Sequence, residues 1–127
     1  MYSAGECVRI ETNFYEDGNK KAHLFVVILD AKEDDDVTIL IPMCSIPERG
    51  FYDPTTELKV GEHDYVKVPT YMNYNDGWIR NKKWIDANGK KRPPPVDTAT
   101  FKRVCDGMTK TEHIRNDVYD AYLFRKS

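Results

Sequence analysis

The 127-residue sequence predicts an α+β fold, a small barrel followed by two helices, on three observations. Short segments with the apolar patterns of strands follow one another between residues 7 and 92. After the triple proline at 93–95 the spacing of apolar residues becomes helical. The length and the 12% aromatic content suit one folded domain over residues 1–127. We therefore expect five to seven strands over about 7–92 and a helical part over 97–124.

Three segments have the clearest strand patterns. Cys7–Ile10 alternates apolar and polar residues, and His23–Leu29 is a continuous β-branched and aromatic run typical of a buried central strand. Val37–Ile41 is similar, and Pro42 is expected to end it. Residues 30–36 lie between the last two strands and hold five acidic residues and one Lys. This acidic segment predicts a solvated hairpin loop.

Weaker patterns complete the predicted sheet. A turn is expected at 16–19 and another at Asn88-Gly89. The remaining extended segments are expected at 58–69, 70–74, 78–80 and 83–85.

Two helices are predicted after the prolines. Asp97 is a good N-cap for the first helix, and Gly107 suits its C-terminal end. Thr109 and Glu112 match a capping box at the start of the second helix. The apolar residues at helical spacing are Phe101, Val104 and Cys105, then Ile114, Val118, Ala121 and Tyr122.

Charge and apolar content exclude several classes of protein. With 19 basic and 21 acidic residues, the net charge of −2 excludes a wholly basic nucleic-acid coat protein. The longest apolar stretch, Leu24 to Leu29, is far too short for a membrane span, and the first residues lack a signal-peptide pattern. Three widely spaced cysteines fit reduced thiols, so a cytoplasmic location is expected.

A basic segment at 80–92 is the strongest charge feature. It holds six basic residues and one acidic residue, with tryptophans interleaved. Such a pattern suits single-stranded nucleic acid, although a solvated loop gives the same pattern. The candidate RNA-binding residues here are Trp78, Arg80, Lys82, Lys83, Trp84, Lys90, Lys91 and Arg92.

Several short motifs have a familiar order. His23–Asp30 is an apolar strand that begins with a polar residue and ends in an acid, and Val37–Ser45 is a strand followed by Pro-Met-Cys-Ser. Gly61–Lys67 and Pro69–Tyr74 follow, and Phe101–Gly107 continues the pattern. Together these motifs resemble the PemK/MazF-like toxins of bacterial toxin–antitoxin systems.

The resemblance covers about residues 7–124 and has definite implications. It implies a small SH3-like β-barrel of five to seven strands, a homodimer, an antitoxin protein as partner, and metal-independent cleavage of single-stranded RNA. The family commonly has Arg before the central strand, where this chain has Lys21 or His23, and Thr-Ser where it has Cys44-Ser45.

Cleavage of RNA without a metal needs an acid, a base and a cation for the phosphate. His23, beside Lys21, and His63, between two carboxylates, are the acid/base candidates, and Lys21 and Lys67 would stabilise the phosphate. Each histidine also has a plain structural interpretation, as a strand-end residue or a turn residue. His113, in the first turn of a predicted helix, is interpreted as a surface residue.

Further RNA contacts are expected close to these groups. The candidates are Ser45, Tyr65, Tyr71 and Tyr74. A tyrosine ring can stack on a base, although ordinary aromatic cover of a sheet explains the same residues. No metal site and no cofactor are expected, because no metal-binding or phosphate-loop motif is found.

The alternatives are a non-catalytic RNA- or protein-binding module of the same fold, of bacterial or phage origin, and an interaction protein whose acidic loop at 30–36 meets a basic partner.

Overall fold

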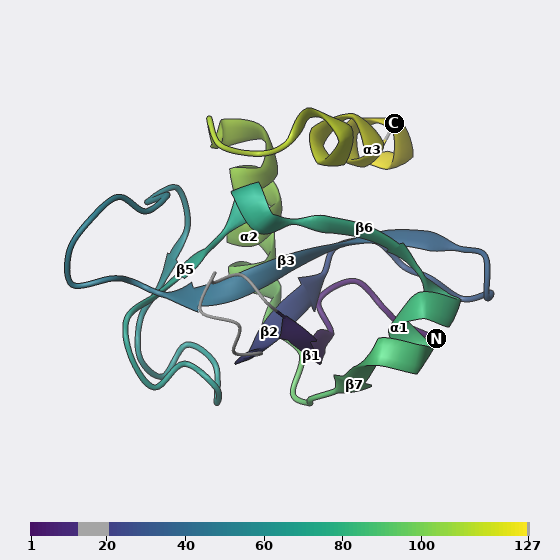
Figure 1. Cartoon of the computed structure of the whole chain (residues 1–127), viewed down its shortest axis with the longest axis horizontal. Helices are drawn as coiled ribbons and strands as arrows, with labels where there is room; N and C mark the ends of the chain where they lie inside the picture. Colours follow the sequence, from purple (N-terminus) through teal and green to yellow (C-terminus); the bar gives the residue numbers. More distant parts are fainter. Residues whose placement is uncertain (13–20, 127) are drawn as a thin grey trace.

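The long strand β3 organises the fold, and Figure 1 shows it running across the middle of the computed structural model, which describes residues 1–12 and 21–126. The predicted turn at 16–19 lies outside the described residues. The strands are β1 (Cys7–Thr12), β2 (Lys21–Val27), β3 (Val37–Ser45), β4 (Glu57–Leu58), β5 (Thr70–Met72), β6 (Trp78–Asn81) and β7 (Gly89–Lys91). The helices are η1 (Tyr74–Asp76), α1 (Lys82–Asn88), α2 (Thr98–Lys110) and α3 (Asn116–Lys126).

The seven strands form one antiparallel sheet, so the predicted α+β class and strand number are confirmed. Its order is β4-β5-β3-β2-β1-β7, and β6 also pairs with β3. One edge of β3 pairs with β2, and the other edge is shared between β6 at its start and β5 at its end. Among the described strands none closes the sheet into the expected barrel. The chain between β6 and β7 forms α1, and these two strands pair with β3 and β1.

Both faces of the sheet are covered. Alternate residues of a strand point to opposite faces, and residues paired across two strands share a face. One face, with Val26 and Ile41, packs against α2 and α3. The opposite face, with Phe25 and Leu40, packs against Ile85 of α1. Figure 1 shows α3 and α1 on different sides of the strands.

The helix α2 begins as predicted and ends later. The Asp97 side chain accepts a hydrogen bond from Thr100 N at 2.7 Å, which confirms the N-cap. The predicted stop at Gly107 is wrong, because α2 continues to Lys110. A glycine is required at position 107 within α2, because the Cβ of any other residue would collide with the Tyr74 hydroxyl. The predicted capping box is therefore also wrong: Thr109 lies within α2, Glu112 follows the end of α2, and α3 begins at Asn116.

A third helix, α1, replaces an expected extended segment at 83–85. The Asn81 side chain accepts a hydrogen bond from Trp84 N at 2.8 Å, as an N-cap does. Gly89 follows as the C-cap and begins β7. The short apolar run around Trp84 and Ile85 fits one helical turn as well as a strand, and the cap favours the helix.

Among the described helices, none has the length and hydropathy that crossing a membrane requires.

Candidate functional site

A pocket opens where β2 and β3 separate. Their pairing ends at Phe25 and Pro42. Contrary to the prediction, β3 does not end at Pro42 but runs on to Ser45, paired with β5. Over the same length, β2 pairs with β1 alone. The fork between the two strands forms the β2–β3 pocket, which has a volume of about 480 Å³.

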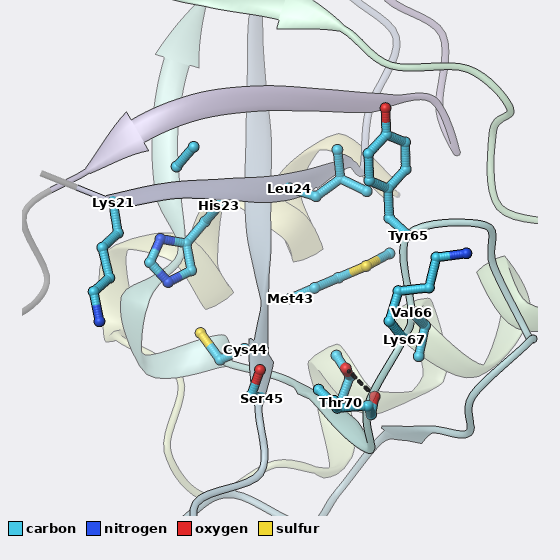
Figure 2. Close-up of a pocket in the computed structure, with 12 residues that line it drawn as sticks. Lys21, His23, Leu24, Met43, Cys44, Ser45, Tyr65, Val66, Lys67 and Thr70 are labelled. Carbon is cyan, nitrogen blue, oxygen red and sulfur yellow. Dashed lines mark hydrogen bonds between the residues drawn. The ribbon is translucent and has the colours of Figure 1, made fainter.

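Three segments of the chain line the β2–β3 pocket (Figure 2). They are residues 21–24 of β2, residues 43–45 of β3, and residues 65–68 with Thr70, which lie before and at the start of β5. Five residues predicted from the sequence meet here: Lys21, His23, Ser45, Tyr65 and Lys67. His23 is half-buried and the other four are exposed. These five residues give the pocket one imidazole, two ammonium groups and two hydroxyls.

His23 is held by its neighbours on β1. Its Nδ1 lies 2.9 Å from Thr12 Oγ1, and the same hydroxyl donates to the Lys21 carbonyl at 3.3 Å. A hydroxyl hydrogen committed to that carbonyl leaves Oγ1 as the acceptor for Nδ1–H and leaves Nε2 as the basic nitrogen. Burial lowers the pKa of His23, against the opposing effects of the Lys21 carbonyl and Asp76. A neutral, basic imidazole is thus favoured.

Polar groups from η1 lie behind the pocket. Asn73 Nδ2 donates to Asp76 Oδ2 at 2.9 Å and lies 3.7 Å from Cys44 Sγ. Burial raises the pKa of the Cys44 thiol to about 11, with a smaller opposing effect from Asn73. Because a thiolate is the reactive form, Cys44 is not an activated nucleophile. Burial also raises the pKa of Asp76.

His63 does not line the β2–β3 pocket. It is 5% exposed, with Nε2 donating to the Pro94 carbonyl at 2.7 Å and Nδ1 accepting from Tyr65 N at 3.1 Å. Its ring also lies beside Cys7, with Sγ 3.8 Å from Nε2. Both ring nitrogens are engaged, so the geometry gives the predicted acid/base role of His63 no support.

The two remaining tyrosine candidates lie elsewhere. Tyr74 has no exposed surface, and its hydroxyl is hydrogen-bonded to Thr56 and to the Val104 carbonyl. A buried ring cannot stack on a base, so the predicted role of Tyr74 is wrong. Tyr71 is half-buried in β5, with its ring 5.3 Å from that of Tyr52.

The basic segment 80–92 forms β6, α1 and β7, and several of its charges are engaged. Lys82 forms ion pairs with Asp86 at 2.8 Å and Asp34 at 3.4 Å. Lys91 lies 3.5 Å from Glu6. The Arg80 guanidinium lies over the rings of both Trp78 and Trp84. The exposed cations of the segment are Lys83, Lys90 and Lys91, with Arg92 half-buried.

Two residues around His23 were missed from the sequence. Thr12 could have been found from strand alternation, because pairing the two strands places it opposite Lys21, two residues from His23. No local sequence pattern predicts that Asp76 lies near His23, because the path of β3 and the turn at Asn73 bring it there.

Comparisons with known proteins found no match: no family model, no curated protein and no solved structure is similar to this chain. In the part of the chain that the structure describes, no group of three or more His, Cys, Asp or Glu side chains is arranged to hold a metal ion.

Proposed function

We propose that the protein is a metal-independent endoribonuclease that binds a phosphodiester of single-stranded RNA in the β2–β3 pocket. One observation carries the proposal. Three separate segments of the chain bring five polar side chains to the same pocket: Lys21 and His23 from the first, Ser45 from the second, and Tyr65 and Lys67 from the third. An imidazole beside ammonium groups is what metal-free cleavage of RNA needs. Kinship with SH3-like barrel toxins is part of the same proposal.

The chemistry follows from the position of His23. Its Nε2 takes the proton of the ribose 2′-hydroxyl as the 2′ oxygen bonds to phosphorus. Lys21 and Lys67 stabilise the added negative charge, and the Ser45 hydroxyl donates to a phosphate oxygen. The bond from phosphorus to the 5′ oxygen breaks, leaving a 2′,3′-cyclic phosphate. Water protonates the 5′ oxygen, and the proton on His23 neutralises the hydroxide that remains.

Incubation of purified protein with a labelled single-stranded RNA in excess EDTA tests the proposal. We expect cleavage with 2′,3′-cyclic phosphate ends, and a fall of about 10²–10⁴-fold in rate for His23→Ala. His113→Ala is the matched control, because His113 packs against Phe51 and does not line the pocket. Intact RNA with the wild type, or the same loss in both variants, would refute the proposal.

The pH dependence gives a second readout. Because burial lowers the pKa of His23 from its ordinary value of 6.5, the basic form is populated below that pH. The rate should therefore rise with pH below about 6.5 and then level off. A bell-shaped profile would mean that a second side chain in the site acts as the acid, which contradicts the role given to water.

RNA binding without cleavage is the second candidate. It is favoured by the position of His63, which leaves one imidazole at the pocket. In that case RNA stays intact in the assay above, and binding weakens with added salt.

A homodimer and an antitoxin-like protein partner also belong to the proposal. What supports a protein contact is the outer face of α3, where Leu123 is 40% and Phe124 80% exposed. Sedimentation equilibrium of the wild type and of Phe124→Lys distinguishes a dimer formed through this face from a monomer.

A further inference from the structure

A second pocket lies between β1 and α1, and both tryptophans of the chain line it. The β1–α1 pocket has a volume of about 510 Å³. Figure 1 shows α1 and β7 next to each other at the edge of the molecule that carries the N-terminus. The pocket is lined by Arg9, Ile10, Glu11, Trp78, Trp84 and the end of α1 with Lys90.

The two indole rings are held rigidly. Trp78 stacks on Phe25, with ring centroids 4.9 Å apart, and meets the Trp84 ring edge-on at 5.7 Å. The Arg80 guanidinium lies 4.9 Å from the Trp78 centroid and 4.8 Å from that of Trp84. Neither Arg80 nor Phe25 is among the described residues that line the pocket. Phe25 and Arg80 lie against the Trp78 ring and fix it, so the Trp84 ring is the one that offers a preorganised platform for a base.

Two cations at the rim of this pocket lie opposite each other. Arg9 on β1 and Lys90 on β7 are paired residues of the ladder, and both are exposed. Among the described residues, no ion pair involves either of them, whereas the neighbouring Lys91 lies 3.5 Å from Glu6. Like charges directly across two strands destabilise a sheet, and a bound anion would relieve this repulsion.

Carboxylates also line the pocket. Asp86 accepts the Tyr2 hydroxyl at 2.6 Å and the Lys82 ammonium at 2.8 Å, so its charge is compensated. Glu11 offers an acceptor that suits a ribose hydroxyl.

The β1–α1 pocket lies next to the β2–β3 pocket. Ile10, which lines the first, is the direct cross-strand partner of His23, which lines the second. Neighbouring strands are about 5 Å apart. In addition, Trp78 stacks on Phe25, two residues from His23 on the same face of β2. One RNA strand can therefore occupy both pockets.

We infer that the β1–α1 pocket is a nucleotide subsite, which stacks a base on Trp84 and binds the phosphate with Arg9 and Lys90. The identification of the ligand as RNA rests on the proposed function. The subsite takes the nucleotide adjacent to the one at His23, so it contributes to the choice of cleavage position.

Tryptophan fluorescence reports on this subsite directly, because the chain has two tryptophans and both line it. The probes are the four ribonucleoside 5′-monophosphates, which carry a base and a phosphate but no bond for the enzyme to cleave. We expect saturable quenching, and an increase of about tenfold in Kd for Arg9→Ala and for Lys90→Ala. Lys91→Ala is the matched control, because Lys91 pairs with Glu6, and it should change Kd by less than about twofold.

The outcomes separate this inference from the proposed function. Absence of quenching, or an equal effect of Lys90→Ala and Lys91→Ala, overturns the subsite. If quenching shows the expected pattern but RNA stays intact, the subsite is supported and the proposed endoribonuclease activity is refuted. His113→Ala should leave nucleotide quenching unchanged, because His113 packs against Phe51 and lines neither pocket.

Discussion

His23 and His63 have the same side chain in opposite surroundings. His23 is half-buried at the open fork, where one ring nitrogen is held by Thr12. His63 is buried, and it connects the segment before β5 to the prolines that precede α2, through Tyr65 N and the Pro94 carbonyl. The contacts of His63 are those of a structural residue that fixes one wall of the β2–β3 pocket.

The structural role of His63 can be tested by its effect on stability. His63→Ala should lower the free energy of unfolding by about 1–3 kcal/mol, because it removes a buried side chain and its hydrogen bonds to the Pro94 carbonyl and Tyr65 N. Urea unfolding measures this, with His113→Ala as a control that changes stability by about 0.5 kcal/mol or less. Loss of RNA cleavage at unchanged stability would contradict the structural role and return His63 to the acid/base candidates.

At the scale of elements, Pro42 marks the point at which β3 changes its partner strand. It lies within β3 where the pairing to β2 stops, and its carbonyl accepts Asn73 N at 3.0 Å. The next residues of β3 turn to β5, so the fork stays open. The pocket thus forms where β3 stops pairing with β2 and begins to pair with β5.

The path of α2 through Gly107 is a second feature at this scale. In an exposed helix, Gly→Ala stabilises by about 1 kcal/mol. Here an added Cβ would meet the hydroxyls of Tyr74 and Thr56, which are hydrogen-bonded to each other at 2.9 Å. The glycine is therefore required for close packing of α2 on η1.

We predict that Gly107→Ala reverses the usual sign and destabilises by about 1–3 kcal/mol. The loss should be smaller in a Tyr74→Phe background, which removes the colliding hydroxyl. Ala99→Gly, on the exposed first turn of α2, is the control for helix propensity and should cost at most about 1 kcal/mol. A Gly107→Ala protein that unfolds at higher urea than the wild type would show that the packing has room for the methyl group.

Short sequence patterns predict the elements that depend only on neighbouring residues in the chain. The apolar runs of β2 and β3 and the Asp97 cap of α2 are of this kind, and the structure has them. The end of α2 could not be predicted, because Gly107 is required by a contact with Tyr74, 33 positions earlier in the chain. For the site, the sequence indicates Lys21, His23 and Lys67 individually as candidate catalytic residues. Their meeting depends on the fork at Pro42 and on the segment before β5.

At the scale of the whole molecule, the two charged segments pack against each other. Lys82 N and Lys83 N donate to the carbonyls of Asp36 and Asp34, at 3.0 and 3.1 Å. The ion pair between Lys82 and Asp34 has a largely exposed carboxylate, so it contributes little stability. Within the acidic loop, Asp34 is thus the residue whose side chain pairs with the basic segment. The cations at the two pockets, Lys21, Lys67, Arg9 and Lys90, are the ones placed to bind RNA.

The three histidines of the chain provide a direct test of where RNA binds. His23 lines the β2–β3 pocket, His63 is buried, and His113 packs against Phe51 on another part of the surface. Their imidazole resonances therefore report on three separate environments.

The decisive measurement is an NMR titration of the ¹⁵N-labelled protein, observing the imidazole nitrogens while a 2′-O-methyl RNA oligonucleotide is added. The methyl group prevents attack by the 2′ oxygen, so binding is seen without cleavage. We predict that the Nε2 resonance of His23 shifts and saturates, while those of His63 and His113 stay in place. A shift confined to His113, or no shift at all when the RNA is bound, would rule out RNA binding at the β2–β3 pocket.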